Sequence, residues 1–377
     1  MDNTRRQFLK LSGVGIAGVF ILPLVEGCEK HVVTPLIEPS AEPFLTPVSR
    51  FFVQDGGKGA IPGWTQPVFS SADDWSLLVK NGNTIVATLS WGDLMGIVDA
   101  NPAEEVTLMK TIQCVLQSDV RITPTGFFGN AYWTGIPLRL ALEGLDLSLS
   151  SRIQSFLLTG ADGFKNNISI DRLRGAKQLG LVEPLLVYKM NGEPLPPEHG
   201  FPVRLILLEG YGYMNVKWLT EVQAANFAIE GFGTYQKQGY DEEGIMRVNS
   251  EATSLFDNIQ VSPGPLMIFG FALSGTAPII KVEISIDGAS PEAAEIVPLQ
   301  ELEDAGSLPP DLFQLLNSEE YPFRGVWAPW RFTWEGTKGD HTIAIRAFDG
   351  AGHIQPDVDE NQEDGLNGIK VYRVTVT

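Results

Sequence analysis

The chain has 377 residues, with 46 acidic against 27 basic side chains and a formal net charge of −19. Apolar residues make up 44% and charged residues 19%, and 20 Phe and 8 Trp are present, a composition typical of a packed globular protein and not of a disordered one. So negative a chain repels phosphate backbones, which argues against general nucleic-acid binding. The 39 Gly and 25 Pro indicate many turns and exclude a long coiled coil.

The first segment, residues 1–27, predicts an export signal. Arg5 and Arg6 precede an apolar run from Leu11 to Val25, which is shorter than the ~20 apolar residues of a stable membrane span. The arginine pair resembles the twin-arginine signal, whose export route carries proteins that have already folded around a cofactor. An ordinary secretory signal with two incidental arginines is the alternative. We therefore expect a protein in the periplasm or on the outer face of the cytoplasmic membrane.

The next segment, residues 28–47, begins with one of the two cysteines. Gly27 followed by Cys28 resembles a lipoprotein cleavage box, although Glu26 replaces the usual small or neutral residue. A lipid anchor at Cys28 and an unmodified cysteine both remain open. The remainder of the segment is rich in Pro and Glu, so we expect an extended tether.

Residues 48–250 predict an α+β domain in which short apolar strands alternate with turns and a few helical stretches. Leu138, Ala141, Leu142 and Leu145 follow the i, i+3, i+4, i+7 spacing of a short amphipathic helix. Strands are expected over residues 202–208 and 216–222, on either side of a loop rich in Tyr and Gly.

Residues 251–377 predict a second domain, a small β-sandwich. Apolar and polar residues alternate over 282–286, 343–347 and 372–376, and the first two of these runs end at an Asp-Gly turn. Pro309-Pro310 followed by a leucine-rich stretch indicates a helix within residues 307–320, inserted between strands.

Few side chains offer chemistry of their own. None of the four histidines stands at i, i+4 from another, no G-x-S-x-G turn occurs, and C-x-x-C-H is absent, which argues against histidine-based metal sites, serine hydrolases and c-type haem. Two cysteines do not make a disulfide framework. Cys114, in an apolar strand, is therefore either a core residue or a reactive ligand.

Three motifs decide between these alternatives. Asn130 to Arg139, Tyr188 to Arg204 (YKMNGEPLPPEHGFPVR) and Tyr211 to Leu219 (YGYMNVKWL) occur in the order and spacing of the sulfite oxidase family of molybdenum enzymes, which the chain resembles. The stretches 275–278, 282–288 and 346–356 are similar to that family's immunoglobulin-like C-terminal domain. The resemblance thus implies a molybdopterin domain followed by an immunoglobulin-like β-sandwich.

The resemblance also implies a cofactor, molybdenum held by one molybdopterin, and a set of residues around it. Cys114 is implied as the protein ligand of the metal, and a soft thiolate suits such a centre. Tyr188 matches the family's active-site tyrosine; a partly buried core tyrosine is the alternative. Positive charge and donors for the pterin phosphate would come from His199, Arg204, Asn215, Val216 and Lys217.

The pattern breaks near the substrate. Sulfite-oxidising members carry Phe-x-Arg-Asn-His where this chain has Phe52-Val53-Gln54-Asp55-Gly56, and an Asn-Arg-Arg after the ligand cysteine that is also missing. Loss of this positive charge weakens binding of a sulfite dianion and favours a neutral substrate. The family's methionine sulfoxide reductases act on such a substrate, but they lack a C-terminal β domain. Lys58 or Arg121 is either a replacement cation or a solvated loop charge.

From these residues we expect an exported molybdenum oxidoreductase that performs two-electron oxygen-atom transfer on a small, sulfur-containing substrate. The chain has no second redox centre in its sequence, so a separate haem protein is the expected electron partner. The C-terminal domain mediates dimerisation in relatives, which implies a homodimer. The alternatives are a methionine-sulfoxide-reductase-like activity and an inactive family member that serves as a binding or structural module.

Overall fold

The computed structural model describes residues 44–54, 61–115, 127–145, 153–176, 181–227, 231–305, 308 and 320–377. The expected export signal, Cys28 and most of the tether lie outside this part of the chain, as do Lys58 and Arg121. No helix among the described residues is both long and apolar enough to cross a bilayer.

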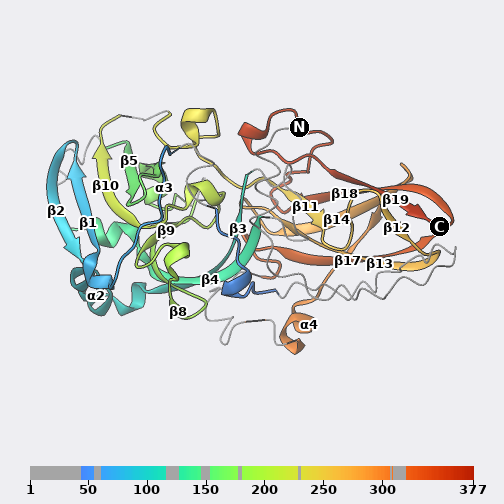
Figure 1. Ribbon diagram of the computed structural model, residues 1–377, viewed down its shortest axis with the longest axis horizontal. Coiled ribbons are helices and arrows are strands. Elements are labelled where there is room, and N and C mark those ends of the chain that lie inside the picture. The colour runs from blue at the N-terminus through green and yellow to red at the C-terminus, as the bar shows by residue number, and fades with distance from the viewer. Residues whose placement is uncertain are drawn as a thin grey trace, which may run out of the picture. The chain divides into compact units, whose positions relative to one another are not determined.

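The first sheet has five strands in the order β2-β1-β10-β5-β6. Alternation of side chains places Leu77 and Val79 of β1 in the core while their neighbours face outward. β1 runs parallel to β10 and antiparallel to β2, beside which it lies in Figure 1. The strands are β1 (Ser76–Asn81), β2 (Thr84–Ser90), β5 (Ser155–Gly160), β6 (Lys165–Ser169) and β10 (Leu219–Ala225).

The second sheet positions the predicted site. Its order is β3-β4-β7-β8, and β9 also pairs with β7. From Leu108 to Gln113 every residue of β3 is buried, so this strand is covered on both faces up to its end. Cys114 follows directly. The strands are β3 (Val106–Gln113), β4 (Phe128–Pro137), β7 (Leu185–Met190), β8 (Glu193–Pro194) and β9 (Arg204–Ile206).

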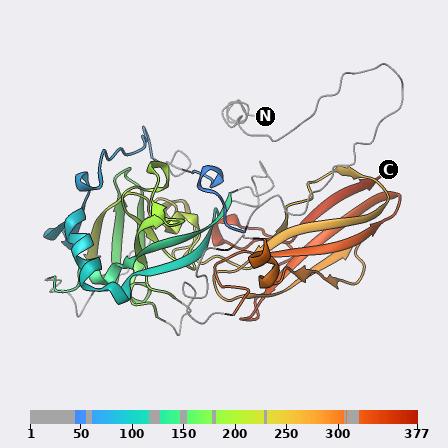
Figure 2. The same cartoon turned by 90° about the horizontal axis from the view of Figure 1, so that it is seen from below.

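Two further sheets form the predicted β-sandwich, whose long strands are drawn in orange and red in Figure 2. One has the order β11-β13-β17-β16 and the other β12-β19-β18-β14-β15. Their inward residues share one apolar cluster, which includes Trp330, Ile345 and Tyr372. The strands are β11 (Asn249–Ala252), β12 (Ile259–Val261), β13 (Gly264–Leu273), β14 (Ile279–Ile286), β15 (Glu292–Ala293), β16 (Glu295–Ile296), β17 (Ala328–Gly336), β18 (Gly339–Asp349) and β19 (Lys370–Val376).

Helices are few and short, so the α+β prediction is confirmed with a strong excess of strand. The longest α-helix described, α2, begins with a capping box in which Ser90 and Asp93 exchange hydrogen bonds. The α-helices are α2 (Trp91–Ala100), α3 (Ile170–Leu173) and α4 (Leu299–Asp304). The 3-10 turns are η1 (Val48–Arg50), η3 (Ala72–Asp74), η4 (Pro102–Glu104), η6 (Leu138–Leu142), η8 (Pro197–His199), η9 (Gly212–Met214), η10 (Gln236–Gln238) and η11 (Gln362–Asp364).

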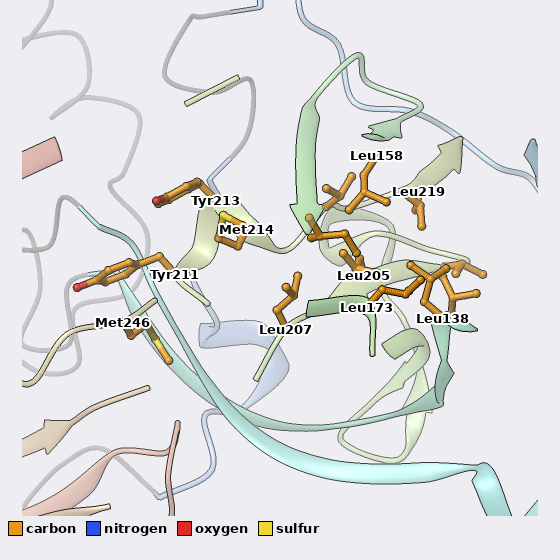
Figure 3. Packing of buried hydrophobic residues seen from close by; sticks show 14 of the residues in the cluster. Leu138, Leu158, Leu173, Leu205, Leu207, Tyr211, Tyr213, Met214, Leu219 and Met246 are labelled. Atoms are coloured by element: carbon orange, nitrogen blue, oxygen red, sulfur yellow. The ribbon is translucent and has the colours of Figure 1, made fainter. Parts of the chain in front are cut away.

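The main core gathers residues from β5, β9, β10 and the turns between them. Leu158, Leu205 and Leu219 are fully buried together in it, while Tyr211 and Tyr213 lie at another part of the same cluster (Figure 3). The cluster also takes in Phe271 of β13 and Trp327, which precedes β17. Thus residues of the β-sandwich segment contribute to the core that surrounds the second sheet.

Several expected elements differ in detail. The amphipathic stretch after Pro137 forms η6, a 3-10 turn in place of the expected α-helix, with Leu138, Ala141 and Leu142 buried. The strand expected from residue 216 begins at Leu219 because residues 216–218 belong to the turn that leads into it. The strands expected at 282–286, 343–347 and 372–376 are confirmed as parts of β14, β18 and β19. Most of the helix expected within 307–320 lies outside the described residues.

Candidate cofactor-binding site

One cavity brings together most of the predicted site residues. Cys114, His199, Arg204, Asn215 and Lys217 all line it, although they come from three separate segments of the chain. The other lining residues are Phe51, Phe52, Gln54, Ile112, Val115, Asp162, Phe164, Gly212, Tyr213 and Tyr235. Val216 lies between two lining residues, with its side chain fully buried in the main core.

Cys114 stands at the end of β3, where its backbone N–H donates to the Phe127 carbonyl at 3.0 Å. The residue is 6% exposed, and it is buried beside aromatic rings. Burial raises the pKa of the Tyr235 hydroxyl, and negative charge on the nearby Cys114 raises it further. Tyr235 contacts Phe164, with ring centroids 6.1 Å apart, so the cysteine end of the cavity has an aromatic wall.

Arg204 and Lys217 are fixed by backbone carbonyls and aromatic faces. Arg204 Nη1 donates to the carbonyl oxygen of His199 at 2.9 Å, and its guanidinium lies 4.9 Å from the Trp133 ring centroid. Lys217 Nζ donates to the carbonyl oxygen of Glu198 at 2.8 Å. Cation–π contacts and carbonyl oxygens hold both side chains in place at the cavity.

Gly200 explains how these two side chains come so close. Its φ is 106°, a conformation that favours glycine, and a Cβ atom there would lie 3.1 Å from Arg204 Cβ and 3.2 Å from Lys217 Cβ. The glycine in the sequence HGFPVR is thus required both by the backbone and by the packing of the two cations against it.

His199 is the third donor at this end of the cavity. Burial first, and then the positive charges of Arg204 and Lys217, lower the pKa of the His199 imidazole to about 3. The ring also bonds to the backbone of Val48, while its buried Nε2 has no hydrogen-bond partner among the described residues. A buried polar atom without a partner is costly unless a ligand supplies one. The neutral ring carries one proton, so Nε2 donates to a ligand only when a bound anion offsets the nearby positive charges and favours the second proton.

Comparisons with known proteins agree with this donor set. Residues 63–232 match the family model described as oxidoreductase molybdopterin binding domain. Rat mitochondrial sulfite oxidase is 30% identical over 200 residues, 47% of this chain and 32% of that protein. Sulfite oxidase of Arabidopsis thaliana is 24% identical over 365 residues, 86% of this chain and 84% of that protein. Residues 63–232 thus form an oxidoreductase molybdopterin binding domain, and the chain is similar to sulfite oxidases.

A solved structure supports this fold for the chain. The sulfane dehydrogenase SoxCD from Paracoccus pantotrophus aligns with a TM-score of 0.65 and 20% identity, covering 90% of this chain and 85% of that chain. The chain spans about a third of the length of the mitochondrial sulfite oxidases that it matches.

The donor set of the cavity fits a molybdopterin. The cofactor carries a phosphate, for which a forked guanidinium, an ammonium and an imidazole are suitable partners. Arg204, Lys217 and the unbonded His199 Nε2 supply these groups on one cavity. A thiolate from Cys114 on the same cavity is a suitable soft ligand for the metal.

Asn215 serves the site through its loop. Its Oδ1 accepts from the Leu207 N–H at 2.8 Å, and its Nδ2 donates to the Tyr211 carbonyl at 2.7 Å, so the side chain closes the turn that leads to Lys217. The carbonyl of Val216 accepts from the Leu205 N–H at 2.8 Å, which joins this turn to β9.

The structure places Tyr188 away from this cavity. Tyr188 on β7 is absent from the cavity lining; its hydroxyl donates to Glu105 Oε1 at 2.5 Å and its ring packs edge-on against Trp91. Strand alternation is the reason, because it directs Tyr188 to the side of the sheet that α2 covers. The tyrosines that line the cavity are Tyr213 and Tyr235. Tyr213 lies within the third motif, whereas no sequence signal singled out Tyr235.

Gln54 lines the cavity at the sequence position where sulfite-oxidising members carry arginine. It follows Phe52, whose ring packs 5.7 Å from that of Phe127, the residue that accepts the Cys114 backbone hydrogen bond. The amide therefore belongs to the wall of the cavity that leads to the cysteine. The chain therefore lacks the positive charge of an arginine at this position, and the uncharged amide of Gln54 lines the cavity instead.

Proposed function

We propose that this protein is an exported molybdenum oxidoreductase that transfers an oxygen atom to or from a small, uncharged sulfur compound. The observation that carries the proposal is that Cys114 and the three donors His199, Arg204 and Lys217 line one cavity. When bound, the molybdenum centre supplies the two-electron oxygen-atom transfer. In the oxidising direction the substrate gains an oxygen atom from water and releases two electrons and two protons; the reducing direction is the reverse.

The residues of the chain have distinct parts in this proposal. Cys114 holds the metal, and Arg204, Lys217 and His199 fix the phosphate, so that the reactive position keeps one orientation. Phe52, Phe164 and Tyr235 exclude water from the cysteine end of the cavity. The Tyr235 hydroxyl is protonated at neutral pH, as in any tyrosine, so it can donate a hydrogen bond to the substrate oxygen.

Gln54 and the aromatic wall support an uncharged substrate. An amide offers hydrogen bonds to a neutral sulfoxide or thioether oxide without the charge that a dianion requires. Aromatic faces carry partial negative charge and favour apolar substituents over anions. We therefore infer that sulfoxides and thioethers are better substrates than sulfite.

Electrons leave or enter through a separate one-electron carrier, for which we propose a haem protein. The strongly acidic chain, with its net charge of −19, favours a basic partner. We further propose the domain organisation suggested by the sequence, with residues 48–250 as the catalytic domain and 251–377 as the dimerisation domain, and export through the twin-arginine route. The periplasmic location and a lipid anchor at Cys28 belong to the same proposal.

The decisive experiment measures metal and turnover together. Purified protein is expected to contain one molybdenum and one pterin per chain, and Cys114→Ser is expected to lose turnover and the thiolate-to-metal absorption band while keeping its fold by circular dichroism. Cys28→Ser is the matched control, since it removes the other cysteine. Wild-type protein that folds without molybdenum would overturn the proposal.

A substrate panel then separates the alternatives. Sulfite, dimethyl sulfoxide, methionine sulfoxide and a thioether are offered with a haem protein or an artificial one-electron carrier. Turnover of the neutral compounds supports the proposal. Protein that is fully loaded with molybdenum yet silent on the whole panel would instead identify an inactive family member that serves as a binding module.

A further inference from the structure

Lys110 is a fully buried lysine on β3, the strand that ends at Cys114. Its Nζ donates to the carbonyl oxygens of Leu208 and Gly210, both at 2.8 Å. These carbonyls belong to the segment that follows β9 and runs into the cavity-lining turn 212–217. One ammonium group thus joins the strand of the cysteine to the turn that carries Lys217.

A second contact fixes the same two segments against each other. A Cβ atom at Gly212 would lie 3.1 Å from the carbonyl oxygen of Gln113, the residue next to Cys114. The absence of a side chain at Gly212 lets the turn approach the end of β3. Because Asn215 closes the turn internally, movement at residues 208–212 would carry Lys217 with it.

Lys110 also belongs to a buried group of charges. The charged side chains that face it are Glu209, Arg204 and Arg172, and Arg172 Nε donates to Glu209 Oε1 at 3.0 Å with both side chains buried. Burial lowers the pKa of Lys110 to about 7, against the opposing attraction of Glu209. Arg172 also pairs with Glu243, at 3.4 Å, and Arg204 reaches the cavity. An anion bound there would favour the protonated form of Lys110.

We propose that Lys110 is a positioning residue that couples the two attachment points of the cofactor, the thiolate of Cys114 and the phosphate-binding turn 212–217. The proposal rests on the cofactor binding put forward above. It assigns to Lys110 no contact with substrate or metal. Its effect is to hold the distance between strand and turn and to add buried positive charge beside the anionic cofactor.

Cofactor retention tests the coupling directly. Lys110→Met keeps the length of the side chain but removes the charge and both hydrogen bonds, and it is expected to release molybdenum and pterin about tenfold faster on dialysis at pH 6, as measured by mass spectrometry and pterin fluorescence. The thiolate-to-metal absorption band of the remaining loaded protein is expected to shift. Lys80→Met, which removes a lysine paired with Glu221 on the first sheet, is the matched control and is expected to release at the wild-type rate.

The pH dependence gives a signature that a merely structural lysine would lack. Cofactor retention in wild-type protein is expected to weaken as the pH rises from 6 to 8.5. Over this range Lys110 loses its proton in the apo-protein. Cofactor binding must then bring that proton back, which makes binding less favourable. The free energy of unfolding of the apo-protein is instead expected to rise with pH over the same range, because the unfolded form keeps the Lys110 proton up to about pH 10. Lys110→Met is expected to abolish the pH dependence of retention.

The outcomes separate the two proposals. Wild-type protein without molybdenum contradicts the proposed function. Loaded wild-type protein whose retention does not change with pH, or a Lys110→Met variant with wild-type retention and an unshifted absorption band, overturns the coupling alone. If Lys110→Met does not fold, Lys110→Gln, which keeps an N–H donor, replaces it in the retention test. The pH dependence of cofactor retention in wild-type protein tests the coupling in either case.

Discussion

Arg204 donates from Nη1 to the backbone carbonyl of His199 at 2.9 Å, so the first and last residues of the HGFPVR sequence are bonded to each other across the turn between them. The turn brings the imidazole of one and the guanidinium of the other to the same cavity. This short motif therefore forms much of an anion site by itself, and its residues can be tested singly.

Replacement of Arg204 should weaken cofactor binding more than it destabilises the fold. We expect Arg204→Ala to lower cofactor affinity by about a hundredfold or more, because the phosphate loses a forked, buried donor. Arg204→Lys keeps the charge but not the fork and should recover only part of the loss. The molybdenum content of each variant after dialysis measures its loss of cofactor affinity. Full retention in Arg204→Ala would show that the phosphate binds elsewhere.

Acid should destabilise the cofactor-free protein through His199. His199 has a pKa of about 3 in the folded chain, whereas an unfolded histidine has a pKa of ~6.5. Between these pH values unfolding is accompanied by uptake of a proton. The free energy of unfolding therefore falls as the pH falls. Relative to the non-titrating His199→Gln, wild-type protein should lose roughly 2–3 kcal/mol between pH 6.5 and 4.5. Urea unfolding of both proteins at several pH values measures this loss of stability. Parallel stability profiles for the two proteins would contradict the lowered pKa.

Gly200→Ala should disturb the site by strain and by crowding. The residue has a positive φ and an added Cβ would crowd both Arg204 and Lys217, so we expect a loss of about 1–3 kcal/mol in stability together with weaker cofactor binding. Gly352→Ala is the control, since its φ of 89° is similar but nothing lies within 4 Å of the added carbon. Equal effects of both variants on cofactor binding would rule out the packing argument.

The two tyrosines should behave differently. Tyr188→Phe removes only the bond to Glu105, so it should cost about 1 kcal/mol in stability and leave kcat unchanged. Tyr235→Phe should lower kcat about tenfold or more, because a donor on the cavity wall is lost. Steady-state kinetics on one sulfoxide measure kcat for both variants and for the wild-type protein. A large kcat effect confined to Tyr188→Phe would restore the sequence-based assignment.

Gln54→Arg should move the preference toward anions. A guanidinium at this position adds positive charge to the wall leading to Cys114, so kcat/KM for sulfite should rise about tenfold or more relative to a neutral sulfoxide. Gln260→Arg, at an exposed position of β12, adds the same charge away from the cavity and should have no effect. An unchanged ratio in Gln54→Arg would mean that Gln54 does not face the substrate.

Sequence alone sufficed where a strand alternates strictly or where a motif is long. The alternation in β14, β18 and β19 predicted the sandwich strands, and the motif ending at Arg204 predicted residues that the structure brings to one cavity. Tyr188, in contrast, lies away from the cavity for a physical reason. A motif gives order along the chain but not the face of the sheet, and that face is set by how α2 packs on β7.

Residues that reach the site from outside the motifs could not be predicted. Tyr235 lies just before η10 and contacts Tyr213 only because the chain returns to the cavity after β10. Lys110 is similar: a lysine in an apolar strand gives no hint of its partners, which are carbonyl oxygens some hundred residues later. Tertiary hydrogen bonds of this kind carry no local pattern.

The edge of β3 has one more neighbour, and it comes from the C-terminal half of the chain. The Thr111 N–H donates to the Gly325 carbonyl at 2.9 Å, and the Trp327 N–H donates to Thr111 Oγ1 at 2.9 Å. A chain cut after residue 250 would therefore leave the strand next to Cys114 with open backbone groups and an uncovered apolar seam. The β-sandwich segment therefore completes the surroundings of the strand that leads to Cys114.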